Sequence, residues 1–256
     1  MRGRDRDAVP PRLRLHVCLW ARVRTASGVA AIWLSAAALG RVVPKTRIYE
    51  HAGAGAALKE MFVTQVDQIA WKFKLAPETI NLSATRAVAE IQVFGISLRN
   101  GKLDEEVLRA IDRAIPFPLI FELTWSGKRK AIAAFKRPSE ADPTKWVVSE
   151  YFGTDWTPED APRRPLPVAL NLSALYDSLL TPMMPVAATA SEDIQARVAR
   201  METIRSKTRE VERIKARLAR EKQFNKRVTI NAELRSVKQE LQRLTAGEPV
   251  GTATDE

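Results

Sequence analysis

Apolar side chains recur at helical spacing in the first long segment of the chain. Leu58, Phe62, Val66, Ile69 and Phe73 are separated by four, four, three and four positions. This spacing places all five on one face of an α-helix. Because a proline follows at position 77 and cannot continue a helix, we predict one long core-packing helix that ends before it.

The next two segments predict a buried strand and a compact helix. Residues 91–96 carry apolar side chains on both faces of a period-two alternation, which is typical of a strand buried on both sides. After an Asn-Gly-Lys turn, residues 104–115 have the signals of a short helix. Asp104 offers an N-cap oxygen, Glu105 and Glu106 suit the positive end of the helix dipole, and Pro116 ends the helix.

Three further strands are predicted at residues 118–125, 129–137 and 145–152. A Ser-Gly-Lys hairpin turn separates the first two, and an antiparallel meander is the simplest pairing of the three. The order of helices and strands predicts an α+β fold, with a small, mostly antiparallel sheet of about four strands and packed helices on one side.

A proline-rich strap and a short helix follow the strands. Four prolines within residues 157–170 exclude a helix or a central strand there. Residues 171–180 predict a short helix capped by Asn171 or Ser173. Residues 182–191 are interpreted as a linker, at the end of which Ser191 would cap a long helical region.

Residues 192–245 predict a helical arm with an apolar seam. The second half of the seam steps by four, three, four and three, which is the heptad spacing of a coiled coil. The two halves are out of phase across residues 223–225. Either the chain turns there into an antiparallel hairpin, with Asn225 as a cap, or one continuous helix carries a stutter; we favour the hairpin. The apolar positions are Val198, Met201, Ile204, Val211, Ile214 and Leu218, then Ile230, Leu234, Val237, Leu241 and Leu244.

The two ends of the chain are assigned to segments outside the folded domain. Residues 1–28 are basic and lead into a short apolar run at residues 26–40, which imitates a secretory signal. The apolar run is shorter than the roughly 20 residues of a membrane span. We favour a leader that is disordered or that results from a start codon assigned too early, and we keep export as the alternative. The α+β domain would then cover residues 29–181, with a first helix near Val29, and residues 246–256 would be a disordered tail.

Net charge is concentrated at the two ends of the chain. The total is +11; residues 192–245 hold fifteen Lys/Arg and eight Asp/Glu, and residues 1–24 hold seven Arg and two Asp. The remainder is therefore close to neutral. A basic arm can attract phosphate backbones without reading base sequence, and it can equally be a solvated helix face.

The residue types needed for catalysis or metal binding are scarce. Cys18 is the single cysteine, and His16 and His51 are the two histidines. No disulfide within the chain and no Cys/His metal cluster can form from this set, which fits a reducing cytoplasm. No glycine-rich phosphate loop occurs. We therefore predict no catalytic residue, no cofactor and no metal.

A two-metal nuclease is the enzymatic alternative. Such a site needs an acid on one strand and an acid-x-Lys pair on the next. Glu122 and Lys136 lie on successive predicted strands, but Ala134 stands where the second acid is required. Glu90 and Glu122 could meet across adjacent strands, although ordinary strand-edge carboxylates explain them better.

Several long strings resemble a known bacterial family. VPKTRIYEHA, VTQVDQIAWKFKLAPETINL, IPFPLIFEL, AAFKRPSEADPTKWVVSEYF and EKQFNKRVTINAEL occur together in this order, and the chain resembles domain-of-unknown-function family 4391 over about residues 30–245. The resemblance implies a gene often found beside DNA methyltransferases and helicases of restriction-like anti-phage systems. It supplies no catalytic residues to carry over.

The apolar seam of the arm and the family resemblance together predict a cytoplasmic, non-catalytic accessory subunit. It would dock a methyltransferase or helicase through its arm, and self-association through the arm is a further possibility. The alternatives are a stand-alone DNA-binding module with nonspecific backbone contacts and a divergent magnesium-dependent nuclease; no membrane partner is expected. The predicted partner-binding residues are Leu234, Val237, Leu241 and Leu244, and the predicted nucleic-acid contacts are Arg227, Arg235, Lys238 and Arg243.

Overall fold

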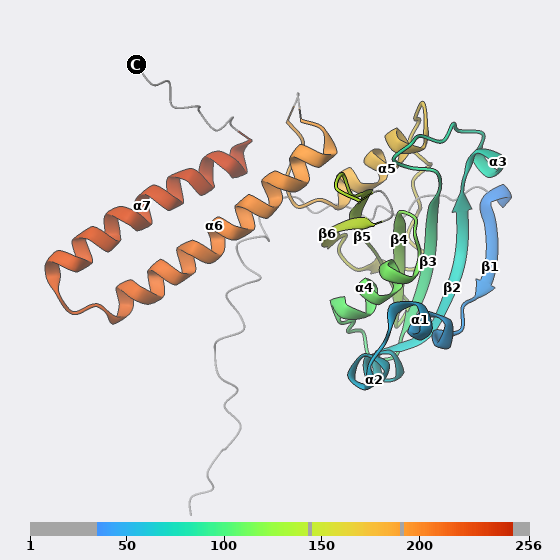
Figure 1. The fold of residues 1–256 in the computed structure, drawn as a ribbon, viewed down its shortest axis with the longest axis horizontal. Coiled ribbons are helices and arrows are strands. Elements are labelled where there is room, and N and C mark those ends of the chain that lie inside the picture. Colours follow the sequence, from blue (N-terminus) through green and yellow to red (C-terminus); the bar gives the residue numbers. More distant parts are fainter. Residues whose placement is uncertain (1–34, 143–144, 190–191, 248–256) are drawn as a thin grey trace, which may run out of the picture.

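A seven-stranded, mostly antiparallel sheet forms the centre of the body (Figure 1) in the computed structural model, which describes residues 35–142, 145–189 and 192–247. Strands β1 to β6 follow one another across the sheet, and β7 pairs with β5. Among these strands, β3 and β4 form the one parallel pair. The α+β class is confirmed, with a larger sheet than predicted. The strands are β1 Ala38–Val42, β2 Val66–Leu75, β3 Ile91–Leu98, β4 Leu119–Trp125, β5 Lys128–Pro138, β6 Trp146–Gly153 and β7 Thr157–Pro158.

Helices cover both faces of the sheet, so the prediction of helices on one side is wrong. The reason lies in β3, where Phe94 and Ile96 face one core and Ile91 and Val93 face the other. A sheet that is apolar on both faces needs two covers. Helices α1, α2 and α4 pack on the first core, and α5 packs on the second. The helices are α1 Lys45–Ala52, α2 Ala56–Gln65, α3 Pro77–Ile80, α4 Glu105–Ala114, α5 Leu172–Leu180, α6 Ile194–Arg220 and α7 Phe224–Ala246.

The long helix predicted through Phe73 is also wrong. Helix α2 ends at Gln65, and the following ten residues form β2, which is paired with β1 on one side and β3 on the other. A bulge between Trp71 and Phe73 moves the apolar side chains from one core to the other. A second irregularity, between Val66 and Gln68, puts Val66 and Ile69 in the same core although they are three positions apart, and this spacing imitates a helix.

The beginning of the body differs from the prediction as well. The expected helix near Val29 falls largely outside the described residues, and the described part, residues 35–42, is a 3-10 turn followed by β1. Helix α1 was not predicted. Its Lys45 Nζ donates to the carbonyl oxygens of Phe62 at 3.1 Å and Val66 at 2.6 Å, which ties α1 to the end of α2.

Capping side chains define where most of the later helices begin. The Asp104 carboxylate accepts from the Glu106 amide at 3.0 Å, as predicted. Asn171 caps α5 through the Ala174 amide at 2.9 Å. Asp193 caps α6, whereas the predicted cap Ser191 lies outside the described residues. Helix α7 begins at Phe224 after Gln223, so Asn225 lies inside the helix and is not its cap.

A buried ion pair fastens α4 to the strands beneath it. Lys136 is 1% exposed, and its Nζ donates to the carbonyl oxygens of Asp112 and Ile115, both at 2.6 Å. It also lies 3.3 Å from Asp112 Oδ1, and the Tyr151 hydroxyl donates to the other carboxylate oxygen. Burial raises the pKa of Asp112 and lowers that of Lys136. Lys136 thereby satisfies carbonyls at the end of α4 that no helical amide reaches.

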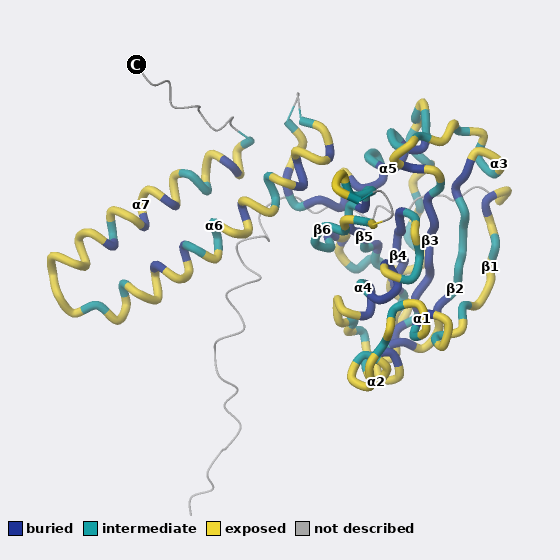
Figure 2. Tube along the Cα trace, in the orientation of Figure 1, coloured by how far each residue is buried: buried dark blue, intermediate teal, exposed yellow. Residues whose placement is uncertain are grey.

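The arm projects from one side of the body (Figure 1). Ile194 and Val198, in the first turns of α6, belong to the same core as α5. Further along α6, Arg205 pairs with Glu150 of β6, and Arg209 lies 3.6 Å from the same carboxylate. Beyond these contacts the arm is exposed except where α6 and α7 face each other (Figure 2).

Replacement of Asp112 by alanine should destabilise the body. Lys136 would remain buried without its carboxylate partner, and loss of one member of a buried pair typically costs about 3–5 kcal/mol. Urea unfolding would measure the change. Arg113→Ala is the matched control, because Arg113 is exposed and its pair with Glu106 at 3.7 Å is a surface contact worth at most about 1 kcal/mol. Equal losses in the two variants would contradict this account.

Candidate functional site

Helices α6 and α7 form an antiparallel hairpin, which confirms the predicted turn and rules out the continuous helix. The turn consists of residues 221–223. The two halves of the predicted seam interlock along the hairpin in two clusters. Near the tip these are Val211, Ile214, Ile230, Leu234 and Val237; near the base they are Val186, Ile204 and Leu244.

The four predicted partner-binding residues lie in this seam. Leu234, Val237 and Leu244 are buried, and Leu241 is half-buried against both clusters. The helix that shields them from water is α6 of the same chain. In the hairpin these side chains therefore stabilise the arm itself, and a second protein is not needed to cover them.

Ion pairs accompany the seam on its exposed sides. Arg217 of α6 pairs with Glu233 of α7, and Lys207 Nζ lies 2.8 Å from Glu240. At the base, Arg200 bonds Glu192 at 2.7 Å and donates to the carbonyl oxygen of Leu244 at 3.0 Å. Exposed pairs contribute little to stability, but those between α6 and α7 hold the two helices in one register.

Positive charge is concentrated at the tip of the hairpin. Residues 213–227, which we term the basic tip, contain seven Lys/Arg and one acid, Glu221. The arm as a whole carries +7, so nearly all of its net charge lies in these fifteen residues. Among the described residues, five cations of the basic tip form no ion pair with a carboxylate: Arg213, Arg220, Lys222, Lys226 and Arg227.

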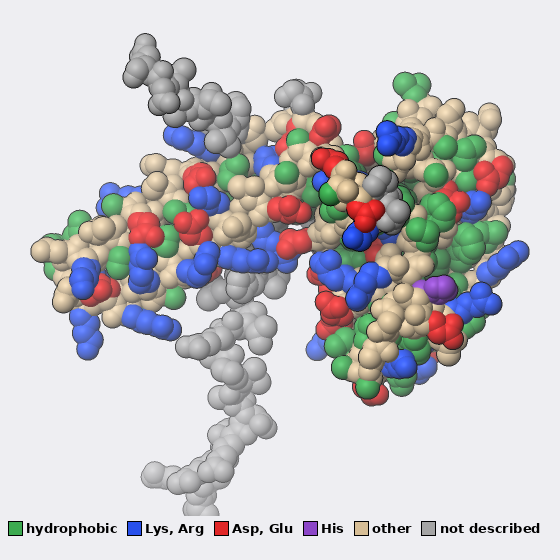
Figure 3. Space-filling model, viewed as in Figure 1, with side chains coloured by type: hydrophobic (Ala, Val, Ile, Leu, Met, Phe, Trp, Pro, Cys, Tyr) green, Lys and Arg blue, Asp and Glu red, His purple; other side chains and the backbone are tan. Residues whose placement is uncertain are grey.

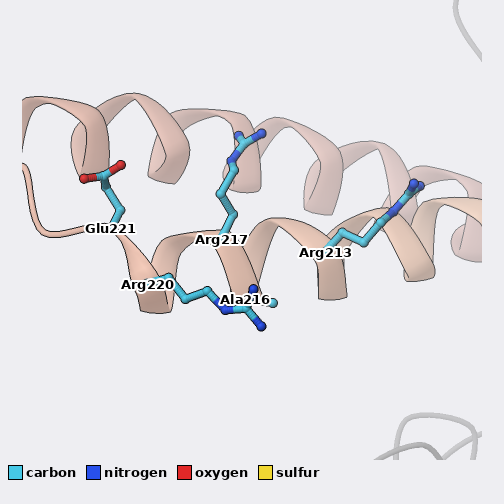
Figure 4. Close-up of a pocket in the computed structure, with 5 residues that line it drawn as sticks. All are labelled: Arg213, Ala216, Arg217, Arg220 and Glu221. Atoms are coloured by element: carbon cyan, nitrogen blue, oxygen red, sulfur yellow. The ribbon is translucent and has the colours of Figure 1, made fainter.

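Three arginines of the basic tip line a shallow depression of about 440 Å³ on α6 (Figure 4). Arg213, Arg217 and Arg220 are four and three positions apart, and so share one face of the helix. In Figure 4, Arg213 and Arg217 point toward α7, whereas Arg220 lies along α6. Guanidinium groups bind phosphate oxygens through paired hydrogen bonds. Arg217 is already paired with Glu233, so Arg213 and Arg220 are the members of the row that suit an anion.

Glu221 lines the same depression, but among the described residues it forms no ion pair with these arginines. Its carboxylate accepts from the Gln223 amide at 2.8 Å within the turn. That backbone hydrogen bond is the largest cause that lowers the pKa of Glu221, with smaller contributions from neighbouring cations. Figure 3 shows basic side chains gathered along the α6 edge of the arm and around its end. The acid therefore serves the turn and leaves the surface positive.

The four predicted nucleic-acid contacts are all exposed, and none forms an ion pair within the described part of the chain. Arg227 belongs to the basic tip. Arg235, Lys238 and Arg243 lie farther along α7, toward the base of the arm. The prediction missed the α6 side of the tip, including Arg213 and Arg220. A count of charge in short windows would have found it, because the surplus peaks around the turn.

The nuclease constellation does not assemble. Glu122 pairs with Arg163 at 2.7 Å and Lys72 at 3.4 Å on the α5 face of the sheet. Lys136 reaches Asp112 on the α4 face. Glu122 is paired in register with Gly95, five residues along β3 from Glu90, about 16 Å at strand spacing. Within residues 35–142, 145–189 and 192–247, no group of three or more His, Cys, Asp or Glu residues is placed to hold a metal ion.

Comparison with known proteins identifies the family. The family model named Domain of unknown function (DUF4391) matches residues 35–241. The chain belongs to this family. No curated protein and no solved structure matches the chain. The matched region of this DUF4391 protein spans the sheet, α5 and most of the hairpin, so the arm is part of the family domain.

No helix in the described ranges has the length and apolar character needed to cross a membrane.

Leu234→Ala should loosen the hairpin without unfolding the body. Leu234 is 8% exposed in the seam, and truncation of a buried leucine costs about 2–5 kcal/mol. Amide hydrogen exchange should show faster exchange in α6 beyond residue 210 and in α7, with unchanged protection of β3 and β4. Val228→Ala, at a 53% exposed position on the same helix, is the control. Unchanged exchange in Leu234→Ala would show that the seam does not hold the arm together.

Proposed function

We propose that this chain is a nucleic-acid-binding accessory protein whose basic tip contacts the phosphate backbone. The observation that carries the proposal is the cluster of five cations without carboxylate partners at the exposed end of a packed hairpin. Contacts of this kind position a protein on nucleic acid without specifying base sequence. The body would hold the hairpin, and the hairpin would present the charge.

The distribution of charge favours binding over simple solvation. Toward the base of the arm, the cations of α6 are paired with acids: Arg197 and Arg200 with Glu192, and Arg205 and Arg209 with Glu150. A helix face that served only solubility would need no such division. On α6 the unpaired charge collects at the tip, where a large polyanion can approach without contact with the body; on α7, Arg235, Lys238 and Arg243 are unpaired as well among the described residues.

The expected strength of this interaction depends steeply on salt. If five side chains each neutralise one phosphate of duplex DNA, the logarithm of the binding constant should fall with the logarithm of salt concentration with a slope of about −4.5. That slope weakens binding by about 500-fold between 50 and 200 mM salt. The ligand would be met in the cytoplasm, the compartment suggested by the single cysteine.

Docking of a DNA methyltransferase or helicase is the second proposal, and it rests on the family resemblance. Because α6 covers Leu234, Val237 and Leu244, a protein partner would have to use the outer faces of the arm or the body. The two proposals are compatible, since a DNA-processing partner and the basic tip could act on the same DNA.

Neutralising the basic tip should weaken DNA binding. We expect the triple variant Arg220→Gln, Lys222→Gln and Arg227→Gln to have a shallower salt dependence. The slope of the logarithm of the binding constant against the logarithm of salt concentration should become less negative by about 3. Fluorescence anisotropy with a labelled oligonucleotide at several salt concentrations would measure both slope and affinity.

The matched control removes the same charge from the body. Arg86, Lys102 and Lys128 are exposed, so their simultaneous change to glutamine alters net charge equally with no change at the tip. In this control variant the salt dependence of the binding constant should stay close to that of wild type. Equal effects of the two triple variants would contradict a binding site at the tip and would indicate a response to net charge alone.

A further inference from the structure

The basic tip carries two exposed apolar side chains. Phe224, the first residue of α7, is 78% exposed, and Val228, one turn later, is 53% exposed. Residues four apart lie on the same helix face. The other apolar residues of α7 that face α6 are buried or half-buried in the seam. Phe224 therefore presents most of its ring to solvent at the end of the arm.

The charges around Phe224 define the chemistry of a ligand for the ring. Lys222 and Lys226 lie two positions to either side, and Arg220 and Arg227 lie four and three positions away. All four are exposed and without an ion pair in the described ranges. An uncharged apolar surface would have to remove water from these cations without compensation. An anionic ligand with flat apolar faces would satisfy both the cations and the ring.

Unpaired nucleotides have this combination. An aromatic side chain flanked by positive charge is the usual arrangement for binding single strands, because phosphates contact the cations and the bases stack on the ring. In an intact duplex the faces of the bases are covered by their neighbours, and uncovering a step costs a few kcal/mol. A phenyl ring gains little from a duplex surface.

We propose that Phe224 stacks on an unpaired base, so that the ligand of the basic tip is single-stranded or locally unpaired nucleic acid in preference to intact duplex. This inference rests on the proposed function, since it names the ligand class of the same site. Val228 has no π-face and therefore cannot stack on a base. The two exposed side chains therefore make a matched pair, in which the stacking ring can be removed separately from its apolar neighbour.

The test compares two labelled probes of equal length, a 20-nucleotide oligo-dT and a 20-base-pair duplex, in fluorescence anisotropy at fixed salt. The full chain is used as wild type and as Phe224→Ala, Phe224→Trp and Val228→Ala. We expect wild type to bind the single strand more tightly than the duplex. Phe224→Ala should weaken single-strand binding by about 10-fold, since stacking contributes about 1–3 kcal/mol per base, and should change duplex binding less than twofold.

The other two variants separate stacking from general apolar contact. Phe224→Trp should retain single-strand binding because it keeps an aromatic face, and Val228→Ala should change either affinity less than twofold. Circular dichroism would confirm that each variant keeps its helices, which is expected because both positions are exposed. Loss of binding in Val228→Ala equal to that in Phe224→Ala would overturn the stacking role.

The remaining outcomes distinguish this inference from the proposed function. If wild type binds both probes but Phe224→Ala weakens both equally or neither, the stacking inference is wrong and backbone binding stands. If wild type binds neither probe, both proposals fail. The last measurement uses vesicles that contain phosphatidylserine. If the protein binds these vesicles through Phe224 and binds neither oligonucleotide, the tip is assigned to an anionic membrane surface and the inference is overturned.

Discussion

The apolar seam between α6 and α7 is the contact on which the proposed role of the arm depends. Without it, α6 beyond Arg209 would be an isolated basic helix, and isolated helices of this length are marginal in water. Ile214 and Leu234 pack within the seam while Arg217 pairs with Glu233 beside it. The seam holds two charged helix ends together against their mutual repulsion. The positive charge of the tip is therefore presented at a defined place.

The body supplies the anchor for this hairpin. Apolar side chains on both faces of β3 and β4 require a cover on each side, and the second cover, α5, shares its core with the first turns of α6. Glu150 on β6 then receives Arg205 and Arg209 farther along the same helix. The predicted sheet had helices on one face only. The helix cover on the second face, which the prediction lacked, also fixes where the arm leaves the body.

Sequence patterns predicted the elements whose signals are local. Asp104, the paired acids after it and Pro116 defined α4, and the phase change at residues 223–225 indicated the hairpin turn. The patterns failed where distant pairing decides the structure. The irregularity after Val66 made the start of β2 resemble a helix, and only its neighbours β1 and β3 reveal it as a strand. Likewise, spacing identified Leu234 and Leu244 as apolar anchors, but it could not show that α6 would be the helix to cover them.

The candidate site was likewise predictable only in the part that depends on local sequence. Composition located a basic arm, but the unpaired status of Arg213 and Arg220 depends on which carboxylates lie across the hairpin. The most direct test of the central claim is hydrogen–deuterium exchange of the full chain with and without a saturating oligonucleotide. The account predicts slower exchange confined to peptides that cover residues 213–228. Protection confined to the body, with exchange at the tip of the hairpin unchanged, would contradict it.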